Sequence, residues 1–265
     1  MRRGDLRDPA ILGALRRRSV DPSLRGLSEV FDACRRGAER GGLDGSGGEI
    51  VEASQVPNES PELGSALRAR IDWVCEEGRA YWHRFDSQVR QNHWHPFVAA
   101  DYDCVRTALQ SLYVPGRRFL EWGSATGVIT IVADLMGYDA YGIELDSSLV
   151  RVARDLAARA GSDARFAVGS FIPMGWKWRP RNADGRTGTI GHGRSGYLEL
   201  GRPLCDFDIV YAFPWSGEES MLLDLFRCHG HEDACLLLHS SERGTRTYGR
   251  GSVEPVALVH GPRDP

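Results

Sequence analysis

Residues 115 to 240 alternate between short apolar runs and longer amphipathic stretches. The apolar runs predict five strands: RRFLEWG, DAYGIEL, ARFAVGSF, FDIVYAFPW and ACLLLHS. The stretches between them, such as SSLVRVARDLAARAG, repeat apolar residues at helical spacing and end at glycine. Strands that alternate with helices of this length predict an α/β fold, namely a Rossmann-like doubly wound, mostly parallel sheet with helices on both faces.

The chain before this region has a helical pattern. Apolar residues recur there at steps of three, four and eight positions, which is typical of one side of a long helix: Leu67, Ile71, Val74, Trp82, Phe85 and Val89. QNHWHPF interrupts the period, and ADYDCVRTALQSLY then predicts a second helix. We therefore expect a helical extension or lid over 61–114, followed by the sheet domain over 115–265.

Two stretches depart from this order. Residues 1–60 contain the glycine-rich GGLDGSGGEI, so we expect a flexible, partly disordered N-terminal region. Residues 172–205 form an insertion that is too long for an ordinary strand-to-helix connection. Within the insertion, TGTIGHGRSGYLEL predicts a hairpin that turns on glycines. Trp176, Lys177 and Trp178 are typical either of contact with an anionic or stacked substrate or of a mobile loop.

Composition narrows the class of protein. The 265 residues are 42% hydrophobic and carry a formal net charge of −3, which suits one sizeable core and does not indicate a globally basic nucleic-acid binder. No apolar run approaches the roughly 18 residues of a membrane-spanning helix, so no membrane partner is expected. The N-terminus makes a poor secretory signal, and six scattered cysteines without a CxxC pair favour ordinary reduced thiols. We therefore expect a cytoplasmic protein.

The stretch FLEWGSATG, residues 119–127, ends a predicted strand in an acid and then breaks into small residues. Small residues let the backbone turn tightly and approach a ligand, and ligands of doubly wound sheets bind beyond the carboxyl ends of the strands. The next strand ends in Glu144, 21 residues after Gly123. That spacing is typical of an acid that accepts hydrogen bonds from both hydroxyls of a ribose. Together these features indicate an adenosine-containing cofactor.

The glycine spacing differs from the GxGxxG fingerprint of nicotinamide cofactors. Glu121-Trp122-Gly123-Ser124-Ala125-Thr126-Gly127 instead resembles the first motif of the class I S-adenosylmethionine-dependent methyltransferases, an acid followed by GxGxG. The strand and helix order over about 117–240 is similar as well. The resemblance implies transfer of a methyl group from S-adenosyl-L-methionine to an unidentified acceptor, which could be a small molecule, a protein or a nucleic acid.

The resemblance also implies roles for individual residues. The implied cofactor-binding residues are Glu121 for the methionine ammonium through water, Gly123, Ser124, Ala125 and Gly127 for methionine and ribose, Glu144 for the ribose hydroxyls, and Leu145, Gly169, Ser170 and Phe171 for the adenine. The residues expected to face the transferable methyl and the acceptor are Tyr211, Phe213, Pro214 and Trp215. His95, in the lid segment HWHPF, is a candidate base or acceptor-binding residue, or alternatively a structural residue.

The sequence departs from the family pattern at several points. Ala125 replaces the usual middle glycine, which is tolerable if its φ is negative. Ser170 stands where an acid often holds the adenine amino group, and YAFPW lacks the polar side chain of the Asn- or Asp-Pro-Pro-aromatic motif. After the fifth strand the chain is short, so TRTYGRG and PVALVHG either form a minimal hairpin or leave the sheet truncated.

The expected chemistry requires little of the protein. A methyl acceptor must lie about 3 Å from the methyl carbon and in line with the leaving sulfur, and a base is needed only when the acceptor is protonated and weakly acidic. Glu218 and Glu219 could supply a base or could simply begin a helix. Residues 228–232, CHGHE, fit a four-ligand metal site poorly, so no metal is expected.

Two other functions remain open. A noncatalytic module could keep the fold, and possibly the cofactor, while binding a partner. A nicotinamide-dependent oxidoreductase is the other alternative, and the glycine spacing argues against it.

Overall fold

The computed structural model describes residues 64–92, 95–178, 190–191, 193–251 and 256–259. Within these residues the centre of the fold is a seven-stranded sheet in the order β3-β2-β1-β4-β5-β6-β7. Five strands are parallel: β1 (Arg118–Trp122), β2 (Asp139–Glu144), β3 (Arg165–Val168), β4 (Ile209–Ala212) and β5 (Cys235–Ser240). Both the five strands and the doubly wound, mostly parallel sheet predicted from the sequence are therefore confirmed.

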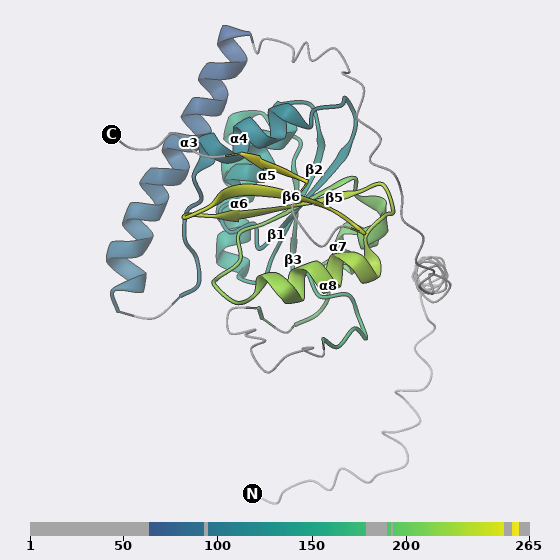
Figure 1. Ribbon diagram of the computed structural model, residues 1–265. Helices are drawn as coiled ribbons and strands as arrows, with labels where there is room; N and C mark the ends of the chain where they lie inside the picture. Colours follow the sequence, from purple (N-terminus) through teal and green to yellow (C-terminus); the bar gives the residue numbers. More distant parts are fainter. Residues whose placement is uncertain (1–63, 93–94, 179–189, 192, 252–255, 260–265) are drawn as a thin grey trace, which may run out of the picture.

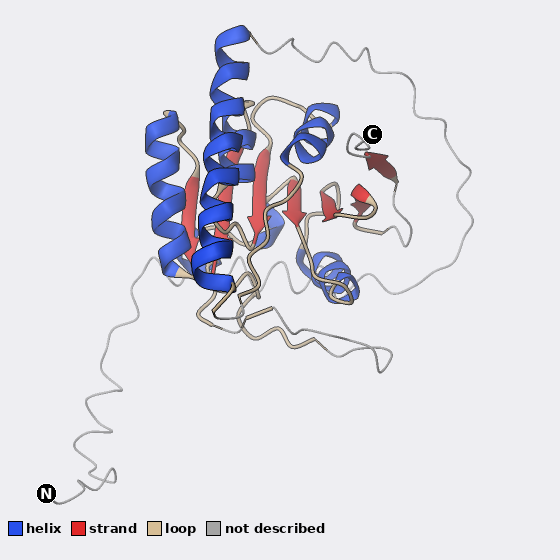
Figure 2. Ribbon diagram, turned by 90° about the vertical axis from the view of Figure 1, so that its left-hand side faces the viewer, coloured by secondary structure: helices blue, strands red, loops and turns tan. Residues whose placement is uncertain are grey.

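Helices cover both faces of the sheet (Figures 1 and 2). One face carries α3 (Ser65–Phe85), α4 (Tyr102–Ser111), α5 (Val128–Leu135) and α6 (Ser147–Ala160). The other face carries the short α7 (Tyr197–Leu200), the 3-10 turn Leu204–Asp206 and α8 (Glu219–His229). In β1, Phe119 packs toward the first set of helices and Leu120 toward the second. Because both faces are buried, the strands read as nearly continuous apolar runs.

Local sequence determines where the helices at the site begin. Asp101 caps α4 by accepting hydrogen bonds from the backbone nitrogens of Asp103 and Cys104, at 3.1 and 3.0 Å. Asp146 caps α6 by accepting one from the backbone nitrogen of Ser148 at 2.7 Å. Such caps typically contribute about 1 kcal/mol each. Two helices therefore begin in capping acids, and α6 begins directly after the tip of β2.

The long helix α3 is anchored to the domain at two points. The Arg70 guanidinium donates to the carbonyl oxygens of Ala160, at 2.6 and 3.1 Å, and Gly161, at 2.9 Å, which end α6. Further along, a Cβ on Gly78 would lie 2.4 Å from Cγ2 of Val128. This close approach requires glycine, and it brings α3 against the start of α5. After α3 the chain makes a short π-helical turn, Asp86–Arg90.

The C-terminal part completes the sheet. β6 (Gly244–Gly249) pairs antiparallel with β5, and β7 (Ala257–Val259) pairs antiparallel with β6. The minimal hairpin expected from TRTYGRG and PVALVHG is therefore present. The hairpin predicted in TGTIGHGRSGYLEL falls largely outside the described residues, and its end, YLEL, is helix α7 rather than a strand. The buried Tyr197 explains this difference, because its hydroxyl accepts a hydrogen bond from Nε1 of Trp122 at 2.8 Å.

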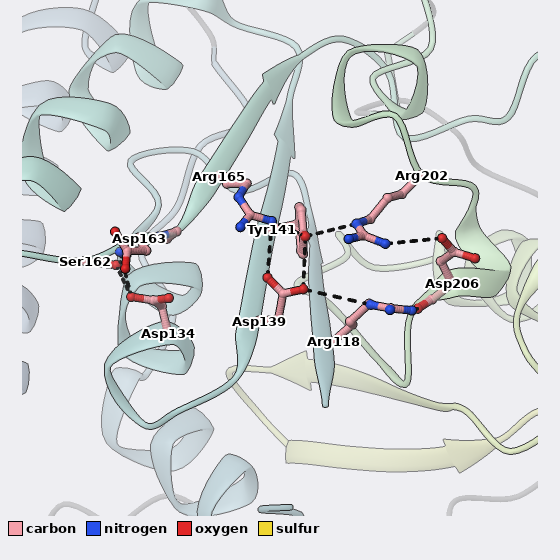
Figure 3. Close-up of polar contacts among 10 residues, drawn as sticks. Arg118, Asp134, Asp139, Tyr141, Ser162, Asp163, Arg165, Arg202 and Asp206 are labelled. Atoms are coloured by element: carbon pink, nitrogen blue, oxygen red, sulfur yellow. Dashed lines mark hydrogen bonds and ion pairs between the residues drawn. The ribbon is translucent and has the colours of Figure 1, made fainter. Parts of the chain in front are cut away.

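At the edge of the sheet where β1, β2 and β3 begin, a polar network joins distant segments (Figure 3). The Asp139 carboxylate accepts from the Tyr141 hydroxyl at 3.0 Å and from Arg165 at 3.3 Å. Arg202, after α7, donates to the same hydroxyl at 3.0 Å, and Arg118 donates to the carbonyl oxygen of Asp206 at 3.2 Å. These contacts tie the end of the insertion to the sheet on the side opposite the small-residue loop.

The described residues also include several of the cysteines and all the helices that could be compared with a membrane span. Cys75, Cys104, Cys228 and Cys235 are free thiols. None of the helices in the described ranges combines the length and apolar character needed to cross a bilayer.

Candidate functional site

The loop between β1 and α5 has a shape that its small residues permit. Gly123 and Gly127 have φ angles of 72° and 75°, in the left-handed region that favours glycine. The backbone nitrogens of Gly123 and Ser124 both donate to the carbonyl oxygen of Ile143, at 2.9 and 3.0 Å, which fixes the loop to β2. A Cβ on Gly127 would lie 2.6 Å from the Phe166 ring, whereas one on Gly123 would meet nothing within 4 Å. The loop is therefore packed on one side and open at Gly123.

Ala125 differs from the expectation. Its φ is 44°, and it is the one non-glycine residue with positive φ in the described part of the chain. The condition of a negative φ is therefore not met, and alanine carries a conformational cost of roughly 1–2 kcal/mol there. The Ala125 nitrogen donates to Oε2 of Glu144 at 2.9 Å. This hydrogen bond offsets part of the cost and holds the loop in its left-handed turn.

Glu144 is the acid that the resemblance assigns to the ribose hydroxyls. Its Oε2 accepts from Ala125, and its Oε1 accepts from the backbone nitrogen of Asp146 at 2.8 Å. Burial raises the pKa of Glu144, although the backbone hydrogen bonds from Asp146 and Ala125 partly offset this effect. A carboxylate offers about four acceptor positions, and the backbone nitrogens of Asp146, Ala125 and Leu145 do not fill all of them, so acceptor capacity remains. The side chain is therefore oriented and still able to bind hydroxyls.

Glu121 is almost fully enclosed, with 6% of its surface exposed. Its Oε2 accepts from the backbone nitrogen of Thr130 at 3.0 Å and from the Thr130 hydroxyl at 2.5 Å. Burial raises the pKa of Glu121 to about 8 despite these bonds, and the nearby Glu144 charge adds to the rise. The two carboxylates thus interact across the loop. Sequence reasoning missed Thr130, although a threonine in the first helical turn after such an acid could have indicated it.

The residues expected around the adenine meet the insertion. The Ser170 hydroxyl donates to the carbonyl oxygen of Gly191 at 2.9 Å, and Leu145 keeps 44% of its surface exposed. Phe171 stacks on Trp122 with ring centroids 5.3 Å apart. Leu145, Ser170 and Phe171 all follow the tips of β2 and β3. Gly191 was not predicted, because nothing in the sequence indicates that the insertion returns to Ser170.

His95 has both ring nitrogens engaged. Its Nδ1 accepts from the backbone nitrogen of Phe97 at 3.1 Å, and its Nε2 lies 3.5 Å from Oδ2 of Asp146. Phe97 is buried in a small cluster with Leu149, against which Ala125 packs. The structure therefore brings the segment from residue 95 to residue 97 onto the small-residue loop. This arrangement favours the structural alternative for His95; its neighbour at position 93 lies outside the described residues.

The loop after β4 contacts that segment. Nε1 of Trp215 donates to the carbonyl oxygen of Pro96 at 3.0 Å, across 119 residues of sequence. Tyr211 lies opposite Glu121 in the sheet register, and its buried hydroxyl has no partner among the described residues. Phe213 packs edge-on against His239, with ring centroids 4.8 Å apart. Pro214 lies between Phe213 and Trp215 in the chain. Sequence reasoning missed His239, which lies inside an apolar strand.

The two candidate bases after this loop have structural contacts. Oε2 of Glu218 accepts from the backbone nitrogen of Trp215 at 3.1 Å, and the Glu218 nitrogen donates back to the Trp215 carbonyl at 3.1 Å. Glu219 accepts a 2.6 Å hydrogen bond from Arg246, which is itself buried. These contacts favour the alternative in which the acids organise the start of α8.

The tryptophans of the insertion pack against the fold. Nε1 of Trp178 donates to Asp224 on α8 at 3.2 Å, and Trp176 lies edge-on to His229 with centroids 6.2 Å apart. Both rings are partly buried against the cluster under α8. Anchoring of the insertion therefore accounts for them better than contact with a substrate. In the described ranges, no three His, Cys, Asp or Glu side chains gather as a metal site would require.

Comparison with known proteins gives one curated relative. No family model matches the chain. The chain is 32% identical over 85 residues to the ribosomal protein L11 methyltransferase of Thermus thermophilus, a match that covers 30% of this chain. The chain spans 34% of the length of that relative.

Several solved structures are similar at low scores. They include a TehB-like SAM-dependent methyltransferase from Corynebacterium glutamicum, with a TM-score of 0.35 and 14% identity over 68% of this chain and 77% of that one. Another is a ribosomal protein L11 methylase from Lactobacillus delbrueckii subsp. bulgaricus, with a TM-score of 0.36 and 15% identity over 51% of this chain and 56% of that one. Likeness at this level says nothing about activity or acceptor.

Proposed function

We propose that this chain belongs to the class I S-adenosylmethionine-dependent methyltransferases, binds that cofactor across the carboxyl ends of its strands and transfers the methyl group to an acceptor. One observation carries the proposal: at the tips of adjacent strands, Glu144 holds the small-residue loop at Ala125, and Glu121 holds Thr130 in the first turn of the helix that follows the loop. An acid pair around a tight loop matches a ligand that carries an ammonium at one end and a ribose in the middle.

The residues present fit this cofactor. Glu144 has oxygens oriented by backbone donors and can accept from the two ribose hydroxyls. Glu121 receives both Thr130 bonds on Oε2, and we assign Oε1 to the ammonium, directly or through water. Gly123 is exposed, with open space where a side chain would lie, which suits close approach of a ligand to the backbone.

The bound cofactor would supply an activated methyl group on a sulfonium. The protein's part is to position the acceptor and to exclude water. We assign that part to the loop after β4, where Phe213, Pro214 and Trp215 follow Tyr211, whose hydroxyl has no partner in the part of the chain that the structure describes. The Trp215 bond to Pro96 would close this loop against the segment from residue 95 to residue 97.

The structural contacts of Glu218, Glu219 and His95 bear on the acceptor. Each of these candidate bases is held by neighbours in the fold. We therefore propose an acceptor whose nucleophile needs no proton removed by these side chains. The curated relative is named for a ribosomal protein, so a ribosomal protein is one acceptor to test; a small molecule or a nucleic acid is not distinguished from it by these contacts.

Calorimetric titration with S-adenosylmethionine and S-adenosylhomocysteine tests the cofactor. Saturable binding of at least one is expected, and no heat from either at high micromolar concentration would refute the proposal. Incubation of the protein with methyl-labelled cofactor and fractionated lysate then tests transfer. The altered YAFPW motif favours a noncatalytic binding module as the second candidate, and a labelled product that depends on Glu144 would exclude a purely binding role.

We also propose a cytoplasmic location, because S-adenosylmethionine is available there. Fractionation of cells that express a tagged full chain tests the location, and recovery of the protein outside the cytoplasmic fraction would contradict it.

A further inference from the structure

The insertion returns to the sheet beside β3. Its last described part is Ile190 to Gly196 without residue 192, here called the return segment. Ser170, just past β3, forms an isolated parallel bridge with Ser195 of this segment. The return segment therefore extends the sheet edge at the tip of β3, beyond the residues that sequence reasoning identified.

If the cofactor binds as proposed, the strand order places its base at this edge. The methionine end lies at the tip of β1 and the ribose at the tip of β2, and the next strand outward is β3. The backbone nitrogen of Gly169 donates to the carbonyl oxygen of Glu144 at 2.8 Å, so the chain leaves β3 directly beside the ribose acid. A base attached to that ribose, and extending away from the methionine, must lie over this exit.

The return segment occupies the polar groups of Ser170. The Ser170 nitrogen donates to the Arg194 carbonyl at 2.9 Å, and the Ser170 carbonyl accepts from the Gly196 nitrogen at 2.9 Å. The hydroxyl donates to the Gly191 carbonyl at 2.9 Å and accepts from the Ile172 nitrogen at 3.2 Å. Ser170 thus holds the return segment in place, and its hydroxyl proton is already committed to Gly191.

The same segment presses on Leu145. A Cβ on Gly191 would lie 2.2 Å from Cδ2 of Leu145, and a Cβ on Gly193 would lie 2.9 Å from Cδ1. Neither glycine has a positive φ, so a side chain at either position is opposed only by Leu145, whose end would have to shift to make room. Leu145 is nevertheless 44% exposed, so one of its sides rests on the return segment and another remains open.

From these contacts we infer that the return segment is the outer wall of the adenine site, which it forms by holding Leu145 against the base and Ser170 away from it. This inference rests on the proposed function. The arrangement also determines the specificity for the base. No carboxylate stands at position 170, and a neutral hydrogen-bond partner discriminates between bases less than a charged one does. We therefore expect S-inosylhomocysteine, in which hypoxanthine replaces adenine, to bind within about tenfold of S-adenosylhomocysteine.

Titration of the full chain with both compounds tests the inference. Gly191→Val should weaken binding of S-adenosylhomocysteine by about tenfold or more, because the new side chain must displace Leu145. Trp178→Phe is the control within the same insertion, since it removes the bond to Asp224 and part of the ring's packing under α8, not a contact with Leu145 or Ser170, and should leave affinity within about twofold.

A double variant distinguishes displacement of Leu145 from misfolding as the cause of weaker binding in Gly191→Val. Leu145→Ala frees the space that valine needs, so Gly191→Val in that background should bind like Leu145→Ala alone. Unchanged affinity in Gly191→Val, an additive loss in the double variant, or more than about a hundredfold rejection of S-inosylhomocysteine by the wild type would overturn the inference. No binding of either compound by the wild type would instead refute the proposed function, and the inference with it.

Discussion

The carboxylate of Glu144 accepts a hydrogen bond from the backbone nitrogen of Ala125 at 2.9 Å, across 19 residues of sequence. Ala125 is held there at a φ of 44°, where the family pattern has glycine. A residue proposed to bind the ribose therefore also supports the loop on which the methionine end would lie. Because a single side chain joins the two subsites, both should respond when it is changed.

Glu144→Ala should weaken binding of S-adenosylhomocysteine by at least about a hundredfold, because it removes two hydrogen bonds to a charged acceptor, each worth about 1.5–3 kcal/mol. Calorimetry on the folded variant measures this loss. Glu199→Ala is a matched control, since Glu199 is a surface acid that pairs with Arg154 on α6. Equal affinity in Glu144→Ala and Glu199→Ala would show that Glu144 does not hold the ribose.

Ala125→Gly should leave cofactor binding intact and raise stability by up to about 1 kcal/mol, because glycine adopts positive φ without the alanine penalty. Ala125→Val should lower stability by more than alanine costs, because a β-branched residue is poorly accommodated in this region. Urea unfolding of the two variants beside the wild type measures both effects. The order glycine, alanine, valine is expected, and a glycine variant less stable than the wild type would contradict it.

Cofactor affinity should be greatest near pH 8. Burial raises the pKa of Glu121 to about 8, so below that pH the carboxyl must lose a proton to bind an ammonium. The cofactor's α-amino group also titrates at about pH 8. Above that pH the amino group is mostly neutral and must gain a proton to bind as an ammonium. Affinity should therefore fall by up to about tenfold per pH unit on each side of the maximum.

Calorimetry between pH 6 and pH 9.5 (roughly two units below and one and a half above the maximum) checks this profile. Glu121→Gln keeps an acceptor for Thr130 but cannot titrate. It should bind more weakly and lose the acidic limb while retaining the basic one. If the wild-type affinity for the cofactor does not change below pH 8, Glu121 does not bind the ammonium.

Stability should fall in mild acid because of His239. Burial lowers the pKa of His239 to about 4, and its Nε2 accepts from the Asp101 nitrogen at 3.3 Å while Nδ1 lies 3.0 Å from the Thr245 hydroxyl. Between about pH 6.5 and pH 4 the unfolded chain binds a proton that the folded chain excludes. The free energy of unfolding should therefore decrease as the pH falls through this window, by up to about 3 kcal/mol.

His239→Gln tests this assignment, because glutamine can accept and donate at the same site without titrating. Urea unfolding at several pH values gives the difference between wild type and variant, in which the titrations of other groups cancel. The difference should change most between pH 6.5 and pH 4 (the unfolded and folded pKa values). A constant difference would mean that His239 titrates normally in the folded protein.

Much of the fold could be predicted from the sequence because it depends on local patterns. Five apolar runs separated by amphipathic stretches are enough to indicate a parallel sheet covered on both faces. The acids at the tips of β1 and β2 were identified for the same reason, since Glu121 and Glu144 each end an apolar run. The helical conformation of YLEL (helix α7) was not predicted. It depends on the hydrogen bond that the buried Tyr197 hydroxyl accepts from Trp122, 75 residues earlier.

The sequence by itself determined the order of strands and helices, the tight loop and the acids beside it, because periodicity, glycines and strand ends are properties of neighbouring residues. Only the tertiary structure decided what those acids contact. Thr130 on Glu121, the Gly191 carbonyl on Ser170 and Pro96 on Trp215 all come from segments whose approach depends on packing of the whole chain. Side-chain partners follow from three-dimensional proximity, and contacts between distant segments leave no regular spacing in a single sequence.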